Sequence, residues 1–140
     1  MRARSAARAV ALQALYQFDL RGEEFSSHLA GFLSDWIRDP ASREYAKALI
    51  EGCRLSQGEV DEIIAAASEN WDLARMSAVD RAILRIGVYE MIYGRDVPPK
   101  TAIDEAVRLA KKFSAEDSSR FINGVLDRIM KDREKRSRGA

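Results

Sequence analysis

The residues best suited to binding chemistry stand at the start of the chain. Arg2, Arg4 and Arg8 all precede the first acidic residue, and a helix would align Arg8, Leu12 and Tyr16 in one row beside its apolar stripe. Guanidinium groups bind phosphates and stack on bases, and a tyrosine ring can stack or donate a hydrogen bond. This combination predicts a surface for single-stranded RNA, although Tyr16 could equally lie at the rim of a core.

Groups that could support catalysis are few. His28 is the only histidine, and nothing in the sequence places a nucleophile beside it. The eight glycines are scattered, so no phosphate-cradling loop is present, and no metal-ligand spacing occurs. Adjacent acidic residues such as Asp61-Glu62 would point about 100° apart on a helix and could not converge. We therefore expect no enzyme, no catalytic residue, no metal site and no cofactor.

Length and composition predict one domain with a real core, since 46% of the 140 residues are hydrophobic. The single cysteine, Cys53, excludes an internal disulfide and is best explained as a buried thiol in a reducing compartment. No apolar run approaches the about 20 residues that span a bilayer. We expect a soluble, cytoplasmic protein with no membrane partner, although the Arg- and Ala-rich start also has the composition of a transit peptide.

The net charge of +1 conceals an uneven distribution. Residues 1–22 hold four arginines and one acid, residues 131–140 hold five basic residues and two acids, and residues 23–110 carry a net charge of −6. Basic ends suit a polyanion and an acidic middle suits a basic protein, because charge patches steer partner choice more than fold. Solvation of exposed chain ends would produce the same pattern.

Apolar residues recur at helical spacing along the whole chain, and no segment alternates as a strand does. Gly22 closes the first helix, Pro40 ends the second, the third stops near Gly58, and residues 70–71 end the fourth. The fold class is therefore all-α, a compact bundle of about seven helices, followed over 131–140 by a disordered basic tail. The predicted helices cover about 5–20, 29–37, 45–53, 60–67, 77–94, 99–113 and the chain from Asp117 or Ser118 onward.

One stretch within the last helix, EDSSRFINGVLD, contains Asn123-Gly124, a pair typical of hairpin turns. The apolar residues around the pair keep helical spacing, so we predict that the helix continues through it. Glycine in a helix costs about 1 kcal/mol relative to alanine, and close approach of a second backbone would explain it. On that interpretation Gly124→Leu destabilises the protein by about 1–3 kcal/mol through overpacking.

Three blocks of the sequence carry a family resemblance. ARAVALQALYQF, VDRAILRIGVYEMIY and DVPPKTAIDEAVRLAKKFSAEDSSRFINGVLDRI resemble, in order and spacing, the NusB family of bacterial transcription antitermination factors. The likeness is weakest between about residues 22 and 72. It implies two packed helical subdomains. It also implies binding to the single-stranded boxA segment of ribosomal RNA leaders together with NusE, the small-subunit ribosomal protein. The complex then acts, with other Nus factors, on the RNA polymerase elongation complex.

The resemblance also implies roles for individual residues. Asp80, at the head of the central helix, is the expected contact for NusE. Ser5, Ala6 and Ala7 stand where relatives can have a denser basic run, so we expect weak RNA binding by the protein alone and tighter binding with NusE. The RNA-facing residues are expected to be Arg4, Arg8, Gln13 and Tyr16 in the first helix, and Asp117, Ser118 and Arg120 at the start of the last.

Two other functions fit the residues. Some RNA cytosine methyltransferases carry a NusB-like accessory domain, although 140 residues leave no room for the cofactor-binding part of such an enzyme. A helical scaffold that binds only proteins is the second. Reversing the charge of Arg4 and Arg8 would separate the functions, because a pure scaffold would keep its partners.

Overall fold

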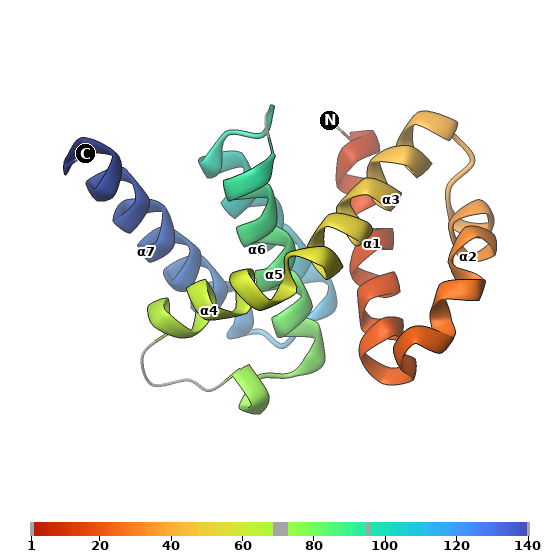
Figure 1. The fold of residues 1–140 in the computed structure, drawn as a ribbon, viewed down its shortest axis with the longest axis horizontal. Coiled ribbons are helices and arrows are strands. Elements are labelled where there is room, and N and C mark those ends of the chain that lie inside the picture. The colour runs from red at the N-terminus through yellow and green to blue at the C-terminus, as the bar shows by residue number, and fades with distance from the viewer. Residues whose placement is uncertain (1, 69–72, 95, 140) are drawn as a thin grey trace. The chain divides into compact units, whose positions relative to one another are not determined.

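A computed structural model of the chain describes residues 2–68, 73–94 and 96–139, and these residues form seven α-helices, two short 3-10 helices and no strand. The predicted all-α fold class is confirmed. The chain divides into two compact units, Met1–Leu55 (unit 1) and Ser56–Ala140 (unit 2), coloured red to yellow and yellow-green to blue in Figure 1. The resemblance had implied two helical subdomains.

Unit 1 is built around two long helices that pack against each other, α1 and α3 (Figure 1). Gly22 ends α1 as predicted, with a positive φ of 66° that suits glycine. Pro40 was predicted to end the second helix but instead begins the third, where its missing N–H costs nothing. The elements are α1 (Arg2–Arg21), η1 (Gly22–His28), α2 (Leu29–Trp36) and α3 (Pro40–Leu55).

Unit 2 surrounds one central helix, α5, which contacts α4, α6 and α7. Its side chains are buried on almost every side, as the unbroken apolar pattern predicted, and Ser77 caps it by accepting a hydrogen bond from the Asp80 amide at 3.1 Å. The elements are α4 (Gln57–Ala67), η2 (Leu73–Arg75), α5 (Ala78–Tyr93), α6 (Pro99–Phe113) and α7 (Ser118–Gly139).

Two predicted features of unit 2 were wrong. The third helix was predicted to stop near Gly58. Instead α3 ends at Leu55, Ser56 separates it from α4, and Gly58 lies inside α4. Residues 131–139 are helical and continue α7, where a disordered basic tail was predicted from the position at the chain end. The end predicted for the fourth helix at residues 70–71 falls outside the residues that the structure describes.

Asn123-Gly124 lies within α7, which confirms the helical interpretation of this pair. The packing explanation was wrong, because a Cβ built on Gly124 meets no atom within 4 Å. The glycine with that role is Gly87 in α5, where a Cβ would come within 2.9 Å of the Leu126 side chain in α7 and 3.4 Å of Ala106 in α6. Close helix packing therefore depends on a glycine that sequence reasoning did not single out.

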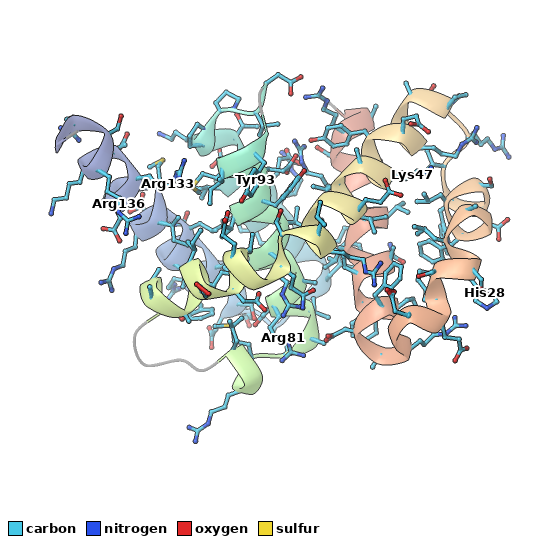
Figure 2. The ribbon with its side chains drawn as sticks, in the orientation of Figure 1. His28, Lys47, Arg81, Tyr93, Arg133 and Arg136 are labelled. Carbon is cyan, nitrogen blue, oxygen red and sulfur yellow. The ribbon has the colours of Figure 1, made fainter. Side chains whose placement is uncertain are left out.

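Two further expectations concern single residues. Cys53 is a free, buried thiol, as predicted. His28 is exposed at the end of η1 (Figure 2). Among the described helices, none has the length and apolar character needed to cross a membrane.

Candidate nucleic-acid interface

The first helix meets an aromatic ring that the sequence did not point to. Arg8 of α1 donates a hydrogen bond from Nη2 to the Tyr45 hydroxyl of α3 at 3.0 Å. The guanidinium carbons of Arg4 and Arg8 lie 4.6 and 5.6 Å from the centre of the same ring, within cation–π distance. Tyr45 therefore links two predicted RNA-binding residues across 37 positions of sequence. Residue spacing gave no signal for it.

Burial separates these arginines into two kinds. Arg8 is only 3% exposed, so its side chain is not on the open surface, whereas Arg4 is partly exposed. The row Arg8–Leu12–Tyr16 was expected to flank the apolar stripe, but Leu12 is 2% exposed and belongs to the core. Only Tyr16 in that row reaches the surface in part. Tyr16 is therefore the member of this row that a ligand can reach, and Arg8 contacts the Tyr45 hydroxyl.

The two remaining residues of α1 that were predicted to bind RNA are Gln13 and Arg2. Gln13 is partly exposed and its side-chain amide donates to the Ala9 carbonyl of the preceding turn at 3.2 Å. That bond is local and exposed enough for a ligand to replace it. Arg2 begins α1, but its side chain is outside the part of the chain that the structure describes.

At the start of α7, three elements of unit 2 meet through one carboxylate. Asp80, in the first turn of α5, accepts hydrogen bonds from Ser114 at 2.5 Å and from Ser118 at 3.0 Å. Ser114 is the residue that ends α6 and Ser118 is the first residue of α7. The Ser114 hydroxyl also lies 3.0 Å from the Ser118 oxygen, which is a second acceptor within its reach. The carboxylate thus ties together the ends of three helices.

This network changes how two predicted residues can act. Ser118 was expected to hold phosphate at a helix N-terminus, but its hydroxyl donates to Asp80 and its amide donates to the Ala115 carbonyl at 3.0 Å. The residue is also 9% exposed. Ser118 therefore positions α7 rather than reaching outward, and Asp80, predicted to meet a partner protein, has an internal role as well.

The neighbours of Ser118 do face solvent. Asp117 and Arg120 are both exposed, one just before α7 and the other in its first turn. The Asp117 carbonyl accepts from the Phe121 amide at 3.3 Å and so begins the hydrogen bonding of the helix. Arg120 leaves a cation at this helix start open to a phosphate, whereas the Asp117 carboxylate would repel one.

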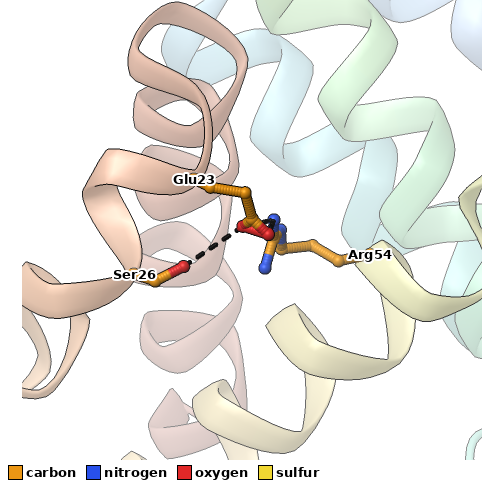
Figure 3. A network of polar contacts seen from close by, with 3 residues as sticks. All are labelled: Glu23, Ser26 and Arg54. Carbon is orange, nitrogen blue, oxygen red and sulfur yellow. Dashed lines mark hydrogen bonds and ion pairs between the residues drawn. The ribbon is translucent and has the colours of Figure 1, made fainter.

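Several other cations are held by the fold. In unit 1, Arg54 of α3 donates to Glu23 of η1 at 2.5 and 2.8 Å, and Ser26 donates to the same carboxylate at 3.2 Å (Figure 3). The Arg54 hydrogen bond, aided by that of Ser26, lowers the pKa of Glu23 below its usual value of 4.5. Arg54 also stacks over Phe18 at 3.8 Å. This cation fastens η1 to α3.

In unit 2, two arginines of α5 are similarly engaged. Arg85 makes a two-point ion pair with Asp61 of α4 at 2.8 and 2.9 Å. Arg81 donates to the carbonyls of Leu73 and Met76 at 3.1 and 2.8 Å (Figure 2). These arginines hold neighbouring segments against α5, so the positive charge that remains open in unit 2 is found mainly elsewhere, along α7.

A cavity of ≈ 250 Å³ lies between α4 and α7 in unit 2. Its floor is apolar, with Ile63 and Ile129, and its rim mixes the acids Glu59 and Glu62 with basic side chains of α7. Asp132 of α7 also lines the cavity, so three acids face Arg133 and Arg136 and the cavity does not favour an anion. In the described residues, no group of three metal-ligating side chains comes together.

Comparisons with known proteins agree with one another. The NusB family model matches residues 5–131. The transcription antitermination protein NusB of Saccharopolyspora erythraea is 48% identical over 130 residues, which cover 92% of this chain and 87% of that protein. The NusB of T. maritima has a solved structure that matches with a TM-score of 0.84 and 36% identity, over 91% of this chain and 90% of that one.

A second solved structure includes binding partners. It contains the antitermination factors NusB and NusE in complex with double-stranded RNA, and it matches with a TM-score of 0.84 and 34% identity, over 94% of this chain and 98% of that one. Sequence and fold thus point to the same family over almost the whole chain. The protein belongs to the NusB family.

Proposed function

We propose that the protein is a transcription antitermination factor that binds the boxA segment of ribosomal RNA leaders as a single strand, together with NusE. The complex acts with other Nus factors on elongating RNA polymerase in the cytoplasm, without catalysis by this chain. The observation that carries the proposal is the likeness, at 34% identity and a TM-score of 0.84, to a NusB solved with NusE and double-stranded RNA, which supports both partners. The choice of a single-stranded boxA ligand rests on the family resemblance. The antitermination name of the 48% identical relative supports it.

In unit 1, the surface offered to RNA consists of Arg4, Tyr16 and Gln13, with Arg2 before them. Arg4 lies against the Tyr45 ring, and Arg8 fixes that ring through its hydroxyl. An aromatic residue beside a guanidinium group provides both stacking and charge for an unpaired base and its phosphate. Arg8 is therefore a positioning residue in this proposal.

In unit 2, Asp117 and Arg120 meet the RNA while Ser118 and Asp80 hold the start of α7 in place. Asp117 can accept a hydrogen bond from a base, and Arg120 can bind phosphate. Asp80 is partly exposed, so it can also face NusE with the carboxylate lone pairs that the two serines leave open. Changes at Asp80 should then affect both RNA and partner binding.

The partner protein is needed because the charge available in this chain is modest. Each phosphate neutralised on a single strand adds a salt slope of about 0.7, so three or four arginines give a weak, salt-sensitive hold. Fluorescence anisotropy with labelled boxA RNA and a scrambled control, with and without NusE, over a salt series, measures this directly. We expect weak binding alone and tight, boxA-selective binding with NusE. Equal affinity in both conditions would contradict the proposal.

A charge reversal tests the RNA surface of unit 1. Arg4→Glu is the cleaner variant, because Arg8 is buried and Arg8→Glu would damage the fold as well. We expect Arg4→Glu to weaken boxA binding while NusE binding in the absence of RNA is unchanged. If RNA binding also stayed unchanged, unit 1 would act only as a scaffold for proteins.

A further inference from the structure

One exposed face of α7 carries a continuous row of basic side chains. At about 100° of helical rotation per residue, all of these side chains point within about 40° of the direction of Gly124. Every one of them is exposed. We define this α7 cation stripe as Arg120, Arg128, Lys131, Lys135 and Arg138, with Gly124 between the first two.

The acids of this part of α7 lie at the edges of the stripe. Asp127, Asp132 and Glu134 point about 60–80° to one side or the other. Lys131 pairs with Asp127 at 2.9 Å and Arg128 with Asp132 at 3.9 Å, yet the basic side chains remain 68% and 45% exposed. Exposed pairs of this kind contribute about 0–1 kcal/mol, so a phosphate can compete for the cations.

Gly124 leaves the surface open at the N-terminal end of the stripe. It is exposed in the middle of a helix, and no atom lies within 4 Å of the place where a Cβ would be. The missing side chain leaves the outer side of the helix bare at this position, so a bulky ligand backbone can approach it closely. From Arg120 to Arg138 the open track is about 27 Å long.

We propose that the α7 cation stripe is a track for the sugar-phosphate backbone of RNA that continues beyond the boxA segment. The proposal rests on the proposed function, because Arg120 is both the first cation of the stripe and an RNA contact at the start of α7. The track holds phosphates and reads no bases, since exposed cations without aromatic or amide side chains carry no sequence information. The track increases the number of nucleotides that contact the protein and does not discriminate between RNA sequences.

The composition of the stripe disfavours other polyanions. A helix that lies on a lipid surface buries an apolar face beside its cations, and the stripe residues include no apolar side chain. A protein partner would bury aromatic or aliphatic anchors at the centre of its interface, and Gly124 offers none. A flexible chain of phosphates needs only evenly spaced charge.

The opposite face of α7 provides a matched control. Arg133 and Arg136 project from the same turns as Lys135 and Arg138 but point about 120–180° from Gly124, where they line the cavity beside Glu59 and Glu62 (Figure 2). Removing two charges from either face changes the net charge equally. Only the stripe face should affect an RNA that follows the track.

The experiment compares the variants Lys135→Gln/Arg138→Gln and Arg133→Gln/Arg136→Gln with wild type, each with NusE. The probes are labelled boxA RNA and the same RNA extended by ten unpaired uridines at one end or the other. For the RNA extended at the end that reaches the stripe, we expect Lys135→Gln/Arg138→Gln to bind with an affinity on the order of tenfold lower than wild type at 0.1 M salt. The slope of log affinity against log salt concentration should fall by about 1.4, because two phosphate contacts are lost. Short boxA RNA should bind all three proteins equally, and circular dichroism should confirm equal helix content.

The outcomes separate the two proposals. If neither extension strengthened wild-type binding, or if both double variants behaved alike, the track would be wrong while boxA recognition stood. If wild type ignored boxA with NusE but still bound the extension through the stripe, the proposed function would be wrong. Stripe-dependent binding to phosphatidylserine vesicles or to an acidic peptide, without an effect on extended RNA, would also overturn the track.

Discussion

The arginines near the start of α1 and the basic residues along α7 carry the same charge in opposite surroundings. Arg8 is 3% exposed and its guanidinium is hydrogen-bonded to Tyr45, whereas every member of the α7 cation stripe is exposed. A buried cation is held by its partners and shapes the surface around it. An exposed cation contributes little to folding and is available to a ligand.

The comparison shows that a run of cations in a sequence has no single meaning. Arg4 and Arg8 are four residues apart on one helix, yet one is partly exposed and the other is buried. In α7 the stripe alternates with Arg133 and Arg136, which belong to another face. Exposure to solvent, contact with an aromatic ring and lining of a cavity all occur among the cations at the basic ends of this chain.

The largest effect is expected when the buried arginine, Arg8, is replaced. Arg8→Ala removes a charged hydrogen bond and leaves the Tyr45 hydroxyl without it, which should lower the free energy of unfolding by about 2–3 kcal/mol. Lys135→Ala, the exposed counterpart, should change it by less than about 0.5 kcal/mol. Urea denaturation of both variants measures the difference. Similar values for the two variants would mean that burial does not distinguish these cations.

A pair of glycines extends the comparison to packing. Gly87→Leu should destabilise the protein by about 1–3 kcal/mol, because the new side chain meets Leu126 and Ala106 in a filled core. The same change at Gly124 should stabilise it by up to about 1 kcal/mol, since the surroundings are open and leucine favours helix. Thermal unfolding of the two variants checks both signs. Destabilisation by Gly124→Leu would restore the packing explanation of that residue.

The Asp80 network is expected to have an intermediate effect. Asp80→Ala removes the acceptor of the Ser118 hydroxyl and one of the two acceptors within reach of the Ser114 hydroxyl, which should cost about 1–2 kcal/mol and loosen the start of α7. Hydrogen exchange of the amides in the first turn of α7 would report the loosening. Ser119→Ala, at the neighbouring position, serves as the control. Unchanged exchange in Asp80→Ala would show that the carboxylate does not position this helix.

The smallest effect concerns Arg54, a partly exposed cation that binds an acid in unit 1. The Arg54 hydrogen bond lowers the pKa of Glu23, so this pair stabilises the protein above the usual pKa of 4.5 and the stabilisation is lost as pH falls through the lowered value. Wild type should therefore melt slightly above Glu23→Gln at pH 7, and the two melting temperatures should converge in acid. A gap that widened in acid would contradict the assigned pKa direction.

Much of the fold followed from local patterns. Apolar spacing predicted the helices of both units, and Gly22 and Ser77 marked helix ends through a positive φ and a capping hydroxyl. Pro40 was assigned to the end of one helix because proline is compatible with either side of a break. The position of the basic tail 131–140 at the chain end suggested disorder, but helix propensity and continuity with α7 prevailed through residue 139.

The candidate site was only partly predictable. The basic start of α1 and the EDSSRF segment were identified as the relevant regions, but Tyr45 was missed because its contact with Arg8 spans 37 residues. Ser118 and Asp80 were given separate roles, although one hydrogen bond joins these two residues, which are 38 positions apart in the sequence. Spacing along a helix predicts neighbours within that helix and nothing about the helix packed against it.

The sequence by itself determined the helical class, the family and the clustering of positive charge at the chain ends, because periodicity, motifs and charge are properties of short stretches. Only the tertiary structure decided which cations are buried, which glycine is needed for packing and which carboxylate ties three helix ends together. Those properties depend on the distances between residues remote in sequence, and such distances are set by how the helices pack within each unit.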